Sequence, residues 1–139
     1  GACIGAVVGL VAITPAAGFV SLGDSVLIGF VASLVSNVVT DLFHKSGRVD
    51  DTLDVFASHG VGGMVGMVLT GVFAAEVGLT SGETATFLKH LAALVAVAVG
   101  AFSLSYALFA VVNSLIPMRV TSTQEERGLD DSQHGEKLH

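Results

Sequence analysis

The sequence predicts an all-α membrane protein with four transmembrane helices and a polar tail, and three observations support this fold class. The chain of 139 residues is 52% hydrophobic and 13% charged, with a mean hydropathy of +0.78, whereas soluble domains carry about 25% charged residues. Of its 18 Lys, Arg, Asp and Glu residues, ten lie in residues 1–118 and eight in residues 119–139. Long uncharged runs approach the roughly 20 apolar residues that a spanning helix needs. We therefore expect a transmembrane region, 1–118, and a tail, 119–139.

The first predicted helix covers residues 1–21, a stretch without a charged side chain. Gly5 and Gly9 lie four residues apart on one helix face, and small residues at this spacing let helices approach closely in lipid. Pro15 predicts an end or a kink late in the run, because proline removes a backbone donor. The chain enters this run directly from Gly1, without the charged region of a signal peptide, so we expect a piece of a longer protein.

The second predicted helix covers residues 25–43. Its small and polar residues recur at intervals of three and four, which indicates a face turned toward protein rather than lipid; they are Gly29, Ser33, Ser36, Asn37 and Thr40. The loop at 44–48 then holds two of the six Lys and Arg residues. Because positively charged loops favour the cytoplasmic side, we expect this loop to be cytoplasmic.

The third predicted helix covers residues 54–75 and contains the main candidate residue. Acidic side chains before it, such as Asp50 and Asp51, can accept from unpaired N–H groups at a helix start and suit its positive end. His59 is the one ionisable side chain between Val55 and Ala75. An ionisable group inside the membrane is costly and marks a functional-site hypothesis. Judged from the residues alone, interhelical hydrogen bonding by His59 is the commoner interpretation.

A stripe of small residues continues from this histidine along the predicted helix. His59, Gly62, Gly63, Gly66 and Thr70 lie at helical spacing on one face. The stripe has almost no side-chain volume, so it predicts either a closely packed neighbouring helix or open space. The sequence does not distinguish these two arrangements.

The fourth predicted helix covers residues 84–117. At 1.5 Å per residue it would extend roughly 51 Å, so it must tilt, bend or project beyond the bilayer. Four crossings return the chain to its starting side, which puts the tail in the cytoplasm together with the basic loop. Lys89 alone opposes this orientation under the positive-inside tendency.

Composition argues against several other function classes. The net charge of −6, with only six scattered Lys and Arg residues, gives no nucleic-acid footprint. The single cysteine, Cys3, can form neither an intrachain disulfide nor a metal cluster. The sequence offers no nucleophile–base pair and no phosphate loop, so we expect no enzyme activity, no cofactor and no metal.

Three segments together resemble the ammonium transporters of the Amt/Mep/Rh family. The stretch RVDDTLDVFASHGVGGMVGMVLTGVFA, Arg48 to Ala74, resembles their penultimate transmembrane helix. Residues 1–20 resemble an earlier helix, and ERGLDDSQHGE, Glu126 to Glu136, resembles their cytoplasmic carboxy-terminal motif. The resemblance implies the last four helices and tail of an eleven-helix fold, built as an inverted repeat and assembled as a homotrimer in the cell membrane.

The resemblance also implies roles for individual residues. His59 would be one of two pore histidines that conduct ammonium or ammonia, with its partner elsewhere in the fold. Val55, one turn earlier, would line the pore, and Asp54 would be the acid that holds the helix start. The tail would be regulatory through Gly128, Leu129, Asp130, His134, Gly135 and Glu136.

Two other functions compete with ammonium conduction. One is a membrane-embedded assembly or signalling module that binds a PII-type regulator through its tail and conducts nothing itself. The other is an independent four-helix transporter of small cations that works as an oligomer. The second is the weaker, because such proteins usually hold an intramembrane carboxylate, whereas Asp and Glu cluster here at helix ends.

Overall fold

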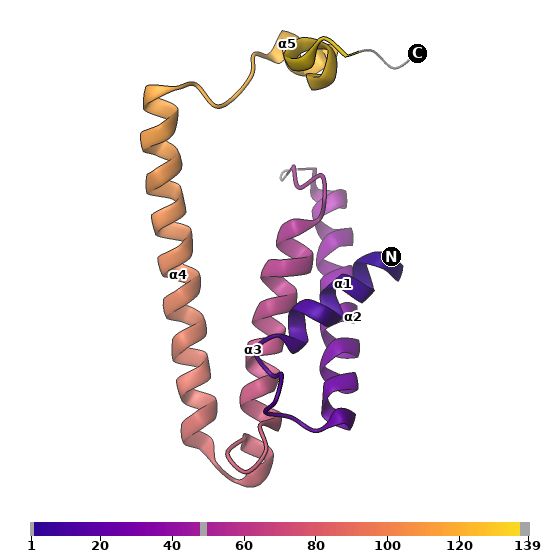
Figure 1. Cartoon of the computed structure of the whole chain (residues 1–139), viewed down its shortest axis with the longest axis vertical. Coiled ribbons are helices and arrows are strands. Elements are labelled where there is room, and N and C mark those ends of the chain that lie inside the picture. The colour runs from indigo at the N-terminus through magenta and orange to yellow at the C-terminus, as the bar shows by residue number, and fades with distance from the viewer. Residues whose placement is uncertain (1, 48–49, 137–139) are drawn as a thin grey trace. The chain divides into compact units, whose positions relative to one another are not determined.

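A computed structural model describes residues 2–47 and 50–136, which contain helices and turns and no strand (Figure 1). The elements are α1 (Ala2–Ile13), α2 (Leu22–Ser46), the π-helix η1 (Phe56–Val61), α3 (Gly62–Phe73), the 3₁₀ turn η2 (Leu79–Ser81), α4 (Thr84–Leu115), α5 (Ser122–Arg127) and the π-helical turn η3 (Asp130–His134). They divide into two compact units, Gly1–Val97 and Ala98–His139. The all-helical prediction is confirmed for the described residues.

Three helical stretches are long and apolar enough to cross a membrane: Leu22–Ser46, Phe56–Phe73 and Thr84–Leu115. Of the helix expected over 1–21, with an end or a kink at Pro15, the structure contains α1, which ends at Ile13 after 12 residues. Pro15 follows in a series of turns, and Thr14 bonds back to α1 through its hydroxyl, which donates to the Leu10 carbonyl at 3.0 Å. The first predicted span is therefore a short helix followed by turns, since proline cannot continue the ladder.

Helix α2 is longer than the predicted 25–43, because capping residues extend both ends. The Ser21 hydroxyl accepts from the Asp24 amide at 3.2 Å and starts the helix at Leu22. Gly47 has φ 58°, the left-handed conformation that commonly ends helices, and its N–H donates to the Phe43 carbonyl. Helix α4 ends at Leu115, two residues before the predicted end.

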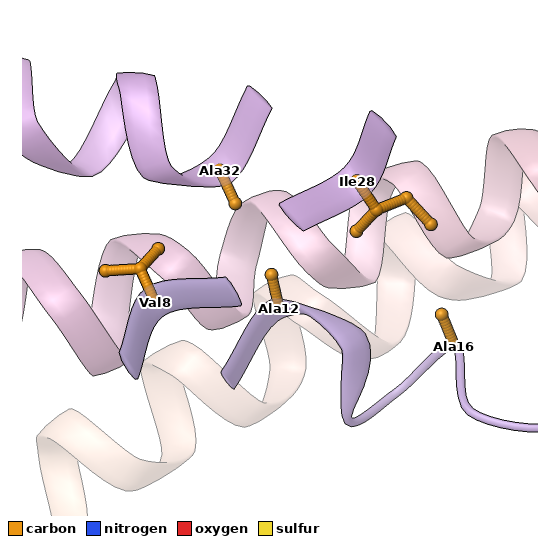
Figure 2. Packing of buried hydrophobic residues seen from close by; sticks show 5 residues of the cluster. All are labelled: Val8, Ala12, Ala16, Ile28 and Ala32. Atoms are coloured by element: carbon orange, nitrogen blue, oxygen red, sulfur yellow. The ribbon is translucent and has the colours of Figure 1, made fainter. Parts of the chain in front are cut away.

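A core of small and branched side chains joins α1 and α2. Figure 2 shows Ile28 and Ala32 of α2 facing the segment that contains Val8, Ala12 and Ala16, all five fully buried. The Ser33 hydroxyl adds a hydrogen bond to the Gly5 carbonyl across the same interface, at 2.9 Å. A Cβ on Gly29 would lie 3.7 Å from the Gly9 Cα atom, so the two helices meet backbone to backbone.

Helix α1 also packs along the glycine stripe of α3, and the two helices run in the same direction. A Cβ on Gly62 would lie 3.1 Å from the Val8 Cγ1, and one on Gly66 would lie 2.2 Å from the Ala12 carbonyl oxygen. Beyond α3, the Ala75 amide donates to the Phe19 carbonyl at 2.7 Å. Over Gly62 to Gly66 the stripe therefore accommodates a neighbouring helix.

The tail forms short helical turns with local caps. Thr121 opens α5 with a capping box, in which its side chain accepts from the Gln124 amide and the Gln124 side chain accepts from the Thr121 amide. Gly135, with φ 68°, closes η3. Arg127 and Asp131 lie 3.3 Å apart between these turns. Local hydrogen bonding therefore orders this segment, which itself contains few large apolar side chains.

Candidate functional site

The helix that carries His59 starts at a carboxylate cap. The Asp51 carboxylate accepts from the Val55 amide at 2.9 Å and from the Phe56 amide at 2.7 Å. These are amides that a helix start leaves without an intrahelical partner. Asp51 therefore supplies the capping carboxylate, in the position where a negative charge also suits the helix dipole.

Asp51→Ala is expected to lower stability by about 1 kcal/mol and to fray the first turn of η1, because two amides lose their acceptor. Hydrogen exchange of Val55 and Phe56 in the complete purified protein measures the effect directly. Asp50→Ala is the matched control: its carboxylate accepts from the nearby Thr52 hydroxyl, at 3.1 Å. Equal exchange in the two variants would contradict the capping assignment.

Asp54 lies at the helix start, but its carboxylate has a different partner. Its side chain is buried, and Oδ1 accepts from the His44 Nε2 at 2.8 Å. Asp54 also has φ 52°, a left-handed conformation that residues other than glycine adopt infrequently. The Asp54 side chain thus links the start of η1 to the last turn of α2, whereas the Asp51 side chain caps the amides at the start of η1. His44 was not among the residues predicted from the sequence, which showed only a histidine at the end of an apolar run.

His59 lies in the π-helix η1, which has six residues. Such wide turns are rare and occur frequently at functional sites. The preceding residue, Ser58, is buried, and its hydroxyl donates to the Asp54 carbonyl at 2.7 Å. The same oxygen lies 3.3 Å from the His59 Nδ1. With its proton donated to Asp54, the Ser58 oxygen can accept from the His59 Nδ1–H in the tautomer that carries that proton, and Nε2 would then be free to accept.

The structure brings His59 and Val55 together on one groove of about 340 Å³ between α1 and the start of η1. The groove is mostly apolar, and its lining residues are Cys3, Ile4, Val7, Leu53, Val55, Ser58 and His59. Both Val55 and His59 are exposed in this chain. The α1 residues of the groove were not predicted, because only the tertiary packing places α1 beside His59.

The predicted tail residues lie in the second unit, away in sequence from the groove. Gly128, Leu129, Asp130, His134, Gly135 and Glu136 are all exposed. Gly128 and Gly135 have φ values of 92° and 68°, so both positions favour glycine. Within residues 2–47 and 50–136, no three His, Cys, Asp or Glu side chains are placed to hold a metal ion.

Comparison with known proteins gives a consistent result along the whole chain. Residues 1–138 match the Ammonium Transporter Family. The chain is 38% identical over 146 residues to an ammonium transporter of Bacillus subtilis, covering 100% of this chain and 36% of that protein. It is 42% identical over 140 residues to one of Aquifex aeolicus, covering 97% and 33%, and 41% identical over 154 residues to ammonium transporter 1 of Schizosaccharomyces pombe, covering 100% and 31%.

The chain thus spans about a third of the length of these curated relatives. The family match covers nearly all of its residues, and three of its helical stretches have the length and composition of membrane spans. The resemblance inferred from the motifs is confirmed, and the chain belongs to the ammonium transporter family.

Proposed function

We propose that the complete protein conducts ammonium or ammonia across the cell membrane past His59, and that this chain supplies its carboxy-terminal helices. The observation that carries the proposal is the position of His59, which is the one ionisable side chain of an apolar helix and lies on a mostly apolar groove. An ionisable residue in such a place is costly and needs a functional reason. The names of the relatives, which are ammonium transporters, indicate the substrate.

A neutral imidazole suits this substrate chemically. Moving the ammonium ion intact through an apolar passage is costly, because the ion loses hydration that the walls cannot replace. The His59 ring offers one acceptor and one donor, so it can accept from ammonium or donate to ammonia. It presents no permanent anion that would also bind K⁺ or Na⁺. Val55 and the apolar groove walls would keep the passage free of competing charges.

The complete assembly would provide the parts that this chain does not. We propose an eleven-helix, multi-pass fold assembled as a homotrimer, in which a second histidine from another part of the fold faces His59. Lys45 lies in the last turn of α2. The contact between His44 and Asp54 joins this end of α2 to the start of η1. The basic residue there supports placing that end in the cytoplasm, and four crossings would return the tail to the same side.

A second candidate function is binding of a PII-type regulator by the tail without conduction. The observation that favours it is the local order of the tail: a capping box at Thr121 and an αL glycine at Gly135 form turns whose motif residues are exposed. Exposed residues on preformed turns cost less entropy to bind than a disordered segment. Conduction and regulator binding are compatible within one complete protein.

Transport by the complete protein tests the proposal. We expect cells that lack other ammonium transporters to grow on low ammonium and to take up ¹⁴C-methylammonium when they express it. Liposomes containing only this chain are the control, and flux through them would instead support an independent four-helix transporter. Regulator binding without flux from the complete protein would overturn conduction in favour of the signalling function.

A further inference from the structure

Ser36 of α2 makes a buried contact with the backbone of the turn that carries His59. Its side chain is fully buried, and its hydroxyl donates to the Ala57 carbonyl at 2.6 Å. Ala57 is the second residue of η1 and precedes His59 by two positions. The serine is 21 residues away in sequence, so this contact joins two elements that only the fold brings together.

The backbone of η1 departs from α-helical pairing at this place. The Gly62 amide, at the end of η1, donates to the His59 carbonyl three residues earlier. The π-turn Phe56–Val61 precedes the regular helix α3, and buried carbonyl groups in irregular backbone accept from side chains as well as from amides. The Ser36 hydroxyl is such a partner for Ala57.

Two hydrogen bonds thus hold the two residues directly before His59. The Ala57 carbonyl is fixed by Ser36 of α2, and the Ser58 hydroxyl is fixed by the Asp54 carbonyl at 2.7 Å. Both Ala57 and Ser58 are buried, whereas His59 itself is exposed on the groove. The direction of the imidazole therefore depends on the conformation of the two anchored residues.

We propose that Ser36 is a positioning residue for His59: its hydroxyl holds the π-turn and so fixes the direction in which the imidazole meets the groove. The proposal rests on the conducting role of His59 for its functional consequence. Its structural content is independent of that role, because the hydrogen bond sets the backbone of residues 57–59 whether or not a substrate passes.

Ser36→Ala in the complete protein tests this role. The variant removes the hydroxyl and leaves the buried Ala57 carbonyl without this donor. The maximal rate of methylammonium uptake per folded transporter should fall by about ten-fold, since small displacements of a functional group reduce rates strongly. KM should change far less than the rate. Amide exchange at residues 57–62 should rise, and the ¹⁵N shifts of the His59 ring should move.

Ser33→Ala is the matched control. Ser33 lies one turn earlier on α2, and its hydroxyl lies 2.9 Å from the Gly5 carbonyl of α1 and 2.7 Å from the Gly29 carbonyl of its own helix. Its loss should weaken packing between α1 and α2 without moving the His59 ring signals. Ser36→Cys, which keeps a weak donor of similar size, should recover part of the rate and of the amide protection.

The outcomes separate this proposal from the conducting function. Unchanged His59 signals and unchanged exchange in Ser36→Ala would overturn the positioning role, and so would equal changes in Ser33→Ala. If the unmodified complete protein transports nothing, conduction fails, and the ring signals and amide exchange still decide the role of Ser36. If Ser36→Ala does not fold, Ser36→Cys should show the same changes at a smaller size, and unchanged His59 ring signals and amide exchange in it would overturn the positioning role.

Discussion

Gly66→Ala is expected to disrupt packing of α1 against α3 and to prevent accumulation of the folded protein. A Cβ at this position would lie 2.2 Å from the Ala12 carbonyl oxygen and 2.8 Å from the Ala12 Cα atom. Both are backbone atoms, so rotation of a side chain cannot relieve the clash. Overpacking of this kind typically costs about 1–3 kcal/mol, and more when helices must separate.

Gly63→Ala is the control for this prediction, because it makes the same chemical change three residues earlier. Its Cβ would meet only the Val11 Cγ1 atom, at an ordinary contact distance of 3.8 Å. Alanine is favoured over glycine within a helix by about 1 kcal/mol, so this variant should be as stable as the unmodified protein or slightly more stable. Gly66→Ala is thus expected to lower the stability of the protein, and Gly63→Ala to leave it unchanged or raise it slightly.

Thermal unfolding of the complete protein in detergent, together with the folded yield in membranes, measures both effects. A loss of stability confined to Gly66→Ala would support close approach of the backbones at Ala12. Equal stability of the two alanine variants would show that α1 and α3 are farther apart than these distances require.

Features that depend on local sequence were predictable. The lengths of the uncharged runs located the long helices, because the thickness of the bilayer fixes how many apolar residues a span needs. Pro15 predicted an end or a kink late in the first run, and α1 ends at Ile13, two residues before it, since proline cannot continue the hydrogen-bond ladder. The glycine stripe predicted either a closely packed neighbouring helix or open space beside it. The structure shows that α1 packs there, at Gly62 and Gly66.

Features that depend on tertiary contacts were not predictable. No local signal in the sequence marks the π-turn at Phe56–Val61, or the hydrogen bond that its Ala57 carbonyl accepts from Ser36 of α2. Asp51 and Asp54 look equivalent in sequence as acids before a helix. Their different partners, the amides of Val55 and Phe56 for one and His44 for the other, follow from how α2 meets η1.

His59→Ala in the complete protein is expected to lower methylammonium uptake by about 100-fold, the scale on which a side chain that handles protons contributes to a rate. The change removes both the acceptor and the donor that the ring offers on the groove, while adjacent Ser58 and Ala57 keep their buried hydrogen bonds. The folded yield should therefore remain close to that of the unmodified protein, so that the loss is specific to conduction.

His90→Ala separates this effect from the loss of any intramembrane histidine. The His90 Nδ1 lies 3.3 Å from the Met67 carbonyl, and its ring is not part of the groove. Its removal should cost some packing between α4 and α3 but leave uptake per folded molecule and discrimination against K⁺ unchanged. Normal uptake and selectivity in His59→Ala would eliminate the pore assignment, because an apolar methyl group cannot accept from ammonium. Equal losses in both variants would instead assign His59 a structural role in helix packing.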